Sequence, residues 1–300
     1  MLPYEPPNLP GLIITDFIGE GGMSKVWKAY DQNLHAMVAV KVLSSELTRN
    51  SEDIRGFAAE ARIMGEIDHP GFVKCHELSQ FGGVWYFVME YVDGYNFGDL
   101  LSRKQHLSEE DCILVCESVA SALCYAWETY RLVHCDIKPD NIMINASGIV
   151  KLTDLGLAHR FESLKDGEMK QSEHVLGTPA YISPEQVYGD VELDCRADIY
   201  SLAASLYHLS TGRVLFPGLG EEDVMRAHCS DAAQARDPRE YHTLSTGFVQ
   251  MLEYMLVKQR DGRVSNWRDV ADMCLAVESG SVFSPRETPG VSSIKLAQQA

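Results

Sequence analysis

The chain has 300 residues, enough to bury a large core, and this length fits one large domain or two smaller lobes. Its hydrophobic fraction of 45% predicts a folded globular protein, whereas its net charge of −17 at pH 7 is unusual. An acidic surface repels phosphate backbones and anionic membranes. We therefore expect no nucleic-acid partner, although a local cationic pocket could still hold a nucleotide.

Eight cysteines are scattered along the chain without a Cys-x-x-Cys pair, so we expect reduced, mostly buried thiols and no zinc site or redox dithiol. No run approaches the ~20 apolar residues that a membrane helix requires, and no apolar core of signal-peptide type follows Met1. The sequence therefore predicts a cytoplasmic location and no membrane segment in this chain.

The N-terminal part reads as a proline-rich, flexible lead-in over residues 1–11, followed by a three-stranded antiparallel meander. Its apolar runs cover residues 12–18, 24–30 and 36–43. The first turn, Gly19-Glu20-Gly21-Gly22, has bare backbone that could approach phosphates closely. A plain tight turn remains the alternative, and the Gly-Lys-Ser/Thr ending of a P-loop is missing.

Lys41 stands alone in an apolar strand, Val38-Ala39-Val40-Lys41-Val42. Burying an unpaired ammonium group is costly, so we expect a partner for it. The helix that we predict over residues 51–67 carries Glu60 at the edge of its apolar face, which makes Glu60 the natural partner.

Two further strands, at residues 71–78 and 84–91, complete a small lobe of five strands and one helix. Helices then follow at residues 97–103 and 108–130, the second with Ser108 as its N-cap. Beyond residue 180 the periodicity predicts helices at 197–212, 221–229, 247–257 and 266–278, and a flexible tail at 280–300.

The stretch His134–Asn141 combines an acid, a base and an amide in eight residues. If Asp136 accepts a proton from a hydroxyl, Lys138 meets phosphoryl charge and Asn141 helps to hold a metal, the loop is a phosphoryl-transfer centre. An exposed polar turn is the alternative. Short strands at 141–145 and 149–153 lead from this loop to Asp154, a second hard oxygen ligand of the kind that Mg²⁺ prefers.

Together these motifs closely resemble the catalytic domain of bacterial, eukaryotic-like (Hanks-type) Ser/Thr protein kinases. The shared order is a glycine-rich hairpin, V-A-V-K, a helix glutamate, H-x-D-x-K-P-x-N, D-x-G, G-T-P-x-Y, S-P-E and D-I-Y-S. The resemblance implies an α+β, bilobal kinase domain over residues 12–279, with an N-lobe at 12–92 and a C-lobe at 93–279.

The resemblance also implies roles for particular residues. Asp136 would be the catalytic base, Lys138 and Thr178 would stand beside it, and Lys41, oriented by Glu60, would hold the phosphates of ATP. Asn141 and Asp154 would bind Mg²⁺, for which Mn²⁺ could substitute. The remaining residues implied in nucleotide binding are Ile18, Gly19, Gly21, Gly22, Val26, Ala39, Met89 as the gatekeeper, and Glu90 and Val92 in the hinge. Asp198 matches the tether of the catalytic loop, and Glu185 with Arg263 the ion pair that anchors the activation segment.

Cys135 departs from the pattern, because many members have an arginine there that pairs with a phosphate on the activation loop. We hypothesise that phosphorylation of this loop, at Ser163 or Ser172, is not strictly required for activity. The alternative is that Arg160 or Lys170 substitutes for the missing arginine.

The expected partners are ATP and proteins that carry Ser or Thr acceptors, including the kinase itself. A homodimer and a longer parent protein with a membrane segment both stay open. A nucleotide-binding pseudokinase is the alternative function. A small-molecule phosphotransferase would explain Asp136, Asn141 and Asp154 but not Lys138 or Thr178.

Overall fold

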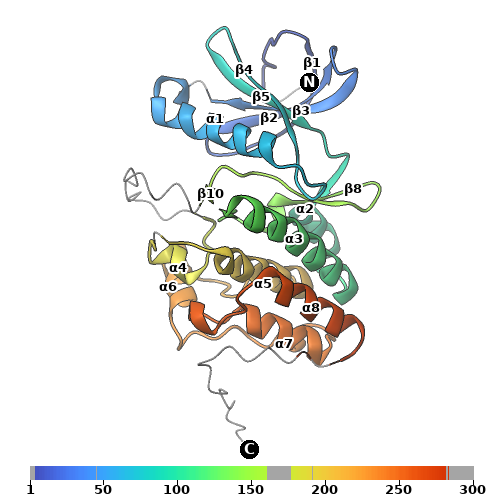
Figure 1. Cartoon of the computed structure of the whole chain (residues 1–300), viewed down its shortest axis with the longest axis vertical. Coiled ribbons are helices and arrows are strands. Elements are labelled where there is room, and N and C mark those ends of the chain that lie inside the picture. Colours follow the sequence, from blue (N-terminus) through green and yellow to red (C-terminus); the bar gives the residue numbers. More distant parts are fainter. Residues whose placement is uncertain (1–3, 45, 161–176, 191, 282, 284–300) are drawn as a thin grey trace, which may run out of the picture.

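The computed structural model describes residues 4–44, 46–160, 177–190, 192–281 and 283. A lobe dominated by a β-sheet lies above a larger, mostly helical lobe (Figure 1). The α+β, bilobal architecture that the sequence predicts is confirmed.

The N-lobe sheet has five antiparallel strands in the order β1-β2-β3-β5-β4. They are β1 (Leu12–Glu20), β2 (Ser24–Asp31), β3 (Ala36–Leu43), β4 (Cys75–Phe81) and β5 (Val84–Glu90). Side chains of β3 alternate between the two faces of the sheet: Ala39 joins the main core, whereas Val38 and Val40 pack in a second cluster with Trp27. Leu9, within the expected lead-in, is buried in this second cluster.

The face of the sheet that carries Ala39 is covered by α1 (Ser51–Glu66) (Figure 1). This helix follows the short 3₁₀ turn η1 (Leu47–Arg49). The helix begins after Asn50, whose side chain accepts a hydrogen bond from the backbone N–H of Glu52. Phe57, Ala61 and Met64 are buried on its inner face. Glu60 is buried with them, so the helix presents a carboxylate to the interior at one point.

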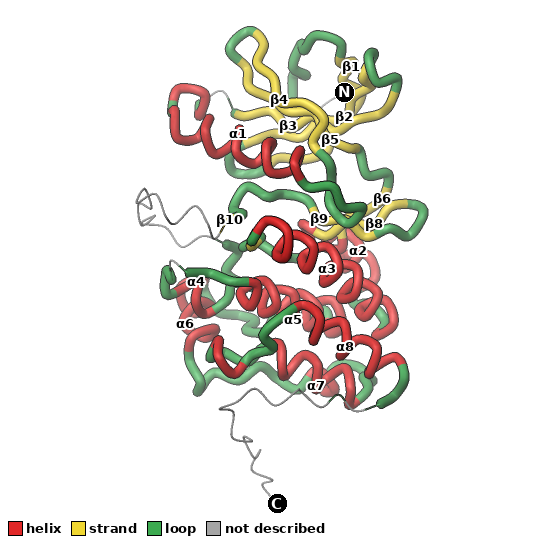
Figure 2. Tube along the Cα trace, in the orientation of Figure 1, coloured by secondary structure: helices red, strands yellow, loops and turns green. Residues whose placement is uncertain are grey.

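The C-lobe is built mostly of helices (Figure 2). Their bounds agree closely with the ranges predicted from the sequence. They are α2 (Phe97–Lys104), α3 (Glu109–Tyr130), α4 (Pro184–Val187), α5 (Cys195–Thr211), α6 (Glu221–Cys229), α7 (Thr246–Met255) and α8 (Trp267–Glu278). The side chain of Ser108 caps α3 through the backbone N–H of Asp111, as expected. The short helix α4 was not predicted.

Further short strands and 3₁₀ turns lie after β5, around the loops of the site and among the helices of the C-lobe. They are β6 (Gly94–Asn96), β7 (Leu132–Val133), β8 (Ile142–Asn145), β9 (Val150–Leu152), β10 (His159–Arg160), η2 (Pro139–Asn141), η4 (Pro238–Glu240) and η5 (Arg260–Gly262). The strand predicted from residue 71 begins only at Cys75, because Phe72 instead forms a bridge with Leu152. Asn141 belongs to η2 rather than to a strand.

Among the described residues, α3 is long and apolar enough to cross a membrane by length and composition alone. This is weak evidence, because a core helix passes the same test, and half of the apolar window is buried inside the protein. Its inner residues, such as Cys112, Cys116 and Leu123, belong to the main core.

Candidate active site

Asp136 lies at the centre of a network of polar side chains on the loop between β7 and β8. Thr178 donates a hydrogen bond to Asp136 Oδ1 over 2.7 Å, and Lys138 Nζ lies 2.8 Å from Oδ2. Lys138 also donates to the hydroxyl of Thr178 over 2.8 Å. The amide of Asn141 donates to both the carbonyl and the carboxylate of Asp136 over 2.9 and 3.0 Å. Asp136, Lys138 and Thr178, predicted to lie at the reacting hydroxyl, are therefore together, and Asn141, predicted as a metal ligand, adjoins them.

Lys41 joins the two lobes at the site. Its ammonium group lies 2.6 Å from Glu60 Oε1, and it also forms a hydrogen bond with Asp154 Oδ1. Glu60 is buried, whereas the side chain of Asp154 is half exposed. The prediction that Glu60 is the partner of Lys41 is confirmed, and Asp154 adds a second carboxylate.

These three charges shift one another's pKa values. Burial raises the pKa of Glu60 to about 7 in spite of the opposing attraction of Lys41. Burial alone would lower the pKa of Lys41, but Glu60 and Asp154 outweigh it, and the net pKa is raised. For Asp154 burial opposes ionisation, yet the ammonium of Lys41 brings its pKa below the ordinary value. Lys41 and Asp154 are therefore held in their charged forms.

The backbone of the loop between β7 and β8 is held by hydrogen bonds to Asp198 of α5. Its carboxylate accepts hydrogen bonds from the backbone N–H groups of His134 and Cys135, over 2.7 and 2.9 Å. Burial raises the pKa of Asp198 to about 7 although both N–H groups favour the ionised form. Cys135 has a φ of +67°, a conformation that a non-glycine residue adopts only when its surroundings enforce it.

The residues predicted to bind the nucleotide lie along β1, β2, β3 and β5. Cross-strand pairing places Gly19 opposite Val26, Val26 opposite Lys41, and Ala39 opposite the gatekeeper Met89. Ile18 is half exposed, and Val92 is buried just beyond β5. The backbone N–H of Glu90 donates a hydrogen bond to the carbonyl of Lys74.

The glycine hairpin leaves open space around its backbone. A Cβ atom added at Gly19, Gly21 or Gly22 would meet nothing within 4 Å in the described structure. The protein's own packing therefore does not require glycine at these positions. Close approach of a ligand to the backbone would require it.

The donor set fits a hard divalent cation that is shared with phosphate. Asn141 directs its amide nitrogen at Asp136, which leaves the amide oxygen for a metal, and Asp154 supplies an ionised carboxylate. The described residues contain no group of three or more His, Cys, Asp or Glu side chains able to hold a metal by themselves. Magnesium bound by two protein oxygens together with phosphate oxygens needs no such group.

The polypeptide beyond the activation segment is anchored by a buried ion pair, as the resemblance implies. Arg263 lies 2.6 and 3.0 Å from the two carboxylate oxygens of Glu185 in α4. The neighbouring Gln186 donates to the carbonyl of Cys135 over 2.7 Å. Ser163, Ser172 and Lys170 lie outside the described residues, as does the side chain of Arg160, so the activation-loop hypothesis stays a prediction.

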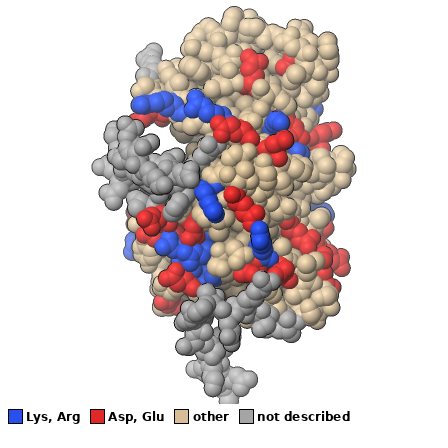
Figure 3. Space-filling model, viewed as in Figure 1, with Lys and Arg blue, Asp and Glu red and all other residues tan. Residues whose placement is uncertain are grey.

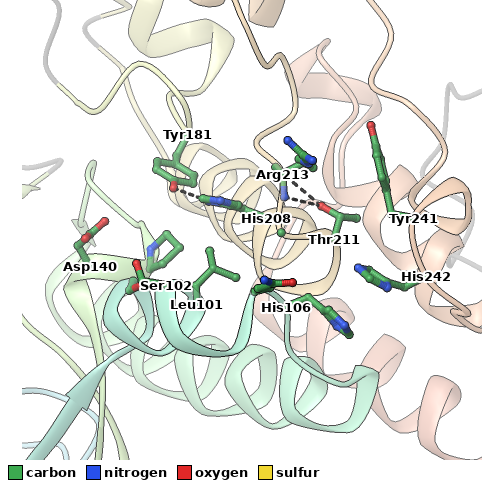
Figure 4. Close-up of a pocket in the computed structure, with 14 residues that line it drawn as sticks. Leu101, Ser102, His106, Asp140, Tyr181, His208, Thr211, Arg213, Tyr241 and His242 are labelled. Carbon is green, nitrogen blue, oxygen red and sulfur yellow. Dashed lines mark hydrogen bonds between the residues drawn. The ribbon is translucent and has the colours of Figure 1, made fainter.

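A cavity of about 740 Å³ opens beside the catalytic loop (Figure 4). One end is formed by Pro139 and Asp140, next to Asp136 in the chain, and α2 and the C-terminal end of α5 form its walls. Tyr181 donates or accepts a hydrogen bond with His208 Nδ1 over 2.7 Å. The cavity is therefore continuous with the loop that carries the base.

Acidic and basic side chains are interspersed on the face that Figure 3 shows, and no broad basic stripe crosses it. This arrangement gives no electrostatic footprint for a nucleic-acid backbone on that face.

Comparison with known proteins agrees with this geometry. Residues 13–276 match the model of the protein kinase domain. The chain belongs to the protein kinase family. The N-lobe sheet with α1, and the helical lobe that carries Asp136, are thus the two lobes of a kinase domain.

The kinase domain has several bacterial relatives. It is 35% identical over 278 residues to the serine/threonine-protein kinase PknA of Mycobacterium tuberculosis, covering 91% of this chain and 62% of PknA. It is 35% identical over 215 residues to PrkC of Bacillus subtilis, covering 72% of this chain and 32% of PrkC. PknB of Mycobacterium leprae is 32% identical over 292 residues, or 95% of this chain and 46% of PknB. The chain thus spans less than two thirds of each of these relatives.

The sequence motifs did not single out Lys151 of β9, a buried lysine that contacts the end of β5. Its ammonium lies 3.0 Å from Glu90 Oε2 and donates to the carbonyls of Pro70 and Phe72 over 2.9 and 3.4 Å. A signal was present, because Lys151 stands between Val150 and Leu152 as Lys41 stands in its own apolar strand.

Proposed function

We propose that this kinase domain transfers the γ-phosphoryl group of ATP to serine or threonine hydroxyls of proteins, with Mg²⁺ as the metal. One observation carries the proposal: the carboxylate of Asp136 is held by Thr178, Lys138 and Asn141 in a single network. The proposed acceptors include the kinase itself, and Mn²⁺ is a possible substitute metal. The proposed location is the cytoplasm.

Each side chain has a distinct task in this mechanism. The ammonium of Lys41, fixed by Glu60, binds phosphate oxygens, and Mg²⁺ bound by Asn141 and Asp154 would neutralise developing charge. Asp136 orients the acceptor hydroxyl and accepts its proton, while Lys138 stabilises the charge on the transferring group. Because little covalent chemistry is asked of the protein, positioning and electrostatics supply most of the catalysis.

Replacement of the base gives the first test. Turnover of about 10 s⁻¹ corresponds to a barrier of about 16 kcal/mol. Asp136→Asn keeps the shape of the side chain but cannot take a proton, and we expect transfer to fall ~10²–10⁴-fold with ATP binding retained. The measurement is transfer of labelled phosphate to dephosphorylated casein, beside ATP affinity from calorimetry. Lys41→Met is the companion variant, and in it both transfer and ATP affinity should fall.

The same assay decides between the kinase and its alternatives. A wild-type chain that binds ATP but transfers phosphate neither to itself nor to casein would be a pseudokinase. Transfer to a small hydroxyl compound in preference to protein would indicate a small-molecule phosphotransferase. The bond between Thr178 and Lys138 favours a protein acceptor, because the resemblance assigns both residues to Ser/Thr-directed enzymes.

We further propose that phosphorylation of the activation loop is not strictly required. Cys135 is buried beside Val133 and Ala197 and carries no charge for a loop phosphate. Instead, Gln186 and Asp198 hold the backbone at this position. Fully dephosphorylated protein should therefore retain activity. Inactive protein that phosphate on Ser172 rescues would contradict the proposal, and the variant Ser163→Ala/Ser172→Ala is the matched control.

A further inference from the structure

Residues 4–11, which precede β1, pack on the outer face of the N-lobe sheet, the face that carries Trp27 and lies away from α1. Leu9 is 3% exposed and belongs to the cluster around Trp27. The backbone N–H of Gln32, just after β2, donates to the carbonyl of Gly11 over 2.9 Å. These residues, which we call the N-terminal strap, are therefore attached to the sheet at their C-terminal end.

The other end of the strap reaches the glycine hairpin. The ring centroid of Tyr4 lies 4.9 Å from that of Phe17 in β1, and Phe17 in turn lies 5.1 Å from the ring of buried Trp27 in β2. The ammonium group of Lys25 in β2 lies 3.6 Å from the centre of the Tyr4 ring. A hydrogen bond with Glu20 of β1 raises the pKa of the Tyr4 hydroxyl. One side chain thus contacts both strands of the hairpin.

These contacts lie at the base of the glycine turn. Glu20 and Lys25 are cross-strand partners, and just beyond them the backbone N–H of Gly21 donates to the carbonyl of Ser24 over 2.8 Å. Successive side chains of a strand point to opposite faces, so Lys25 lies on the outer face and Val26 on the face that packs against the main core. The strap therefore supports the hairpin from behind and leaves the nucleotide face open.

The pairing of β1 shows why such a support matters. This strand lies at the edge of the sheet and pairs with β2 alone, and its register shifts twice, between Ile14 and Asp16 and between Phe17 and Gly19. Glycine also loses more conformational freedom than other residues when its backbone is fixed. A hairpin that spends only part of its time in the binding arrangement loses nucleotide affinity in proportion.

We propose that Tyr4 is a positioning residue for ATP. Its ring fixes Phe17 of β1 relative to Lys25 of β2, and the hairpin is thereby held in the arrangement in which its backbone N–H groups face the phosphates. Tyr4 itself touches no reacting group. This inference rests on the proposed function, and it concerns the binding of ATP and not of the protein substrate.

Removal of the ring is the main test. Tyr4 is 36% exposed, so the domain should fold in the variant Tyr4→Ala. We expect its Kd for ATP with Mg²⁺, from calorimetry, and its KM for ATP to rise about tenfold, because an aromatic pair and a cation–π contact are lost together. Its kcat and its KM for dephosphorylated casein should stay within about twofold of wild type.

Two further variants separate positioning from loss of packing. Tyr4→Phe keeps the contacts with Phe17 and Lys25 and loses the hydroxyl, so its Kd for ATP should stay within about twofold of wild type. Ile13→Thr is the matched control, because it alters an exposed residue of β1 away from the glycine turn, and its Kd for ATP should equal that of wild type.

A wild-type Kd for ATP in Tyr4→Ala would overturn the proposal. So would an equal rise in Ile13→Thr, which general loosening of β1 would give, or a parallel rise in the KM for casein. A wild-type chain that binds no ATP, or that binds it and transfers no phosphate, would instead overturn the proposed function.

Hydrogen exchange of the ATP-free protein locates the effect. Amides of residues 19–24 should exchange about tenfold faster in Tyr4→Ala than in wild type, whereas those of α5 should be unchanged. Tyr4→Phe should restore the wild-type rates. Unaltered exchange over residues 19–24 in Tyr4→Ala, or equally faster exchange in α5, would contradict the proposal.

Discussion

At the scale of single residues, the site depends on carboxylates whose surroundings differ. Glu60 is enclosed by the core and has a pKa near 7, whereas half-exposed Asp154 has its pKa lowered by the same lysine. Burial raises the pKa of both carboxylates and Lys41 lowers both, but the interaction between the two raises the pKa of Glu60 and lowers that of Asp154. Asp154 is thus ionised at neutral pH and can bind a metal ion, while Glu60 gains or loses its proton near neutral pH.

The titration of Glu60 predicts a pH-dependent stability. Its pKa of about 7 in the folded state exceeds the ordinary value of 4.5, so the folded state binds more protons between these values. The free energy of unfolding should therefore fall as pH rises from about 4.5 to about 7, by on the order of 1 kcal/mol per pH unit from this group. Asp198 adds a slope of the same sign.

Urea unfolding of wild type and Glu60→Gln at pH 5 and pH 7 measures this contribution. The variant should show a smaller decrease between the two pH values, because its side chain cannot titrate. The exposed Glu77→Gln serves as the control and should keep the wild-type slope. A slope in Glu60→Gln as steep as in wild type would show that other groups are responsible.

At the scale of elements, a buried ion pair joins α4 to η5. Arg263 is fully buried and also donates to the backbone carbonyls of Arg196 and Lys258 over 2.6 and 3.1 Å, so its guanidinium is satisfied on several sides. The pair holds α4 against the rest of the helical lobe. A helix of only four residues can persist here because it is fixed from outside.

Removal of one partner should be costly. Arg263→Met leaves Glu185 buried without its partner, and we expect a loss of ~3–5 kcal/mol in the free energy of unfolding. Arg268→Met removes a partner of exposed Glu128 and should cost at most about 1 kcal/mol. Chemical unfolding monitored by tryptophan fluorescence measures both. Equal losses of unfolding free energy in Arg263→Met and Arg268→Met would show that burial does not determine what each ion pair contributes to stability.

The residues of the site were predictable from the motifs and the resemblance, including the distant pair Glu185 and Arg263, whereas the short elements were not. Glu60 as the partner of Lys41 follows from the cost of burying a charge, whereas Thr178 beside Asp136 follows from the resemblance to the kinase family. Strand β6 and helix α4 are short and owe their existence to distant partners such as β8 and Arg263.

At the scale of the whole molecule, Lys151 fastens the two lobes together. It joins Glu90 at the end of β5 to the carbonyls of Pro70 and Phe72, and backbone hydrogen bonds between Val73, Leu152 and Gly71 run beside it. These contacts thus join the two lobes near the end of β5. The open side is left to the nucleotide and the acceptor.

Loss of this contact should loosen the connection between the lobes. In Lys151→Met the carbonyls lose their donor, and we expect amide hydrogen exchange over residues 71–73 to accelerate about tenfold. Lys74→Met, which removes an exposed lysine near Asp68, is the control and should leave exchange unchanged. Unaltered protection in Lys151→Met would mean that the backbone bonds alone join the lobes.

The hydroxyl of Thr178 has a consequence for the orientation of the base. It donates to Oδ1 of Asp136, while Lys138 and Asn141 lie at Oδ2. A carboxylate oxygen can accept from more than one donor, so Oδ1 can still accept from a hydroxyl that enters beside Thr178. The rotation of the carboxylate is fixed by these three neighbours before any substrate arrives. Under the proposed function, the substrate therefore does not have to orient the base itself.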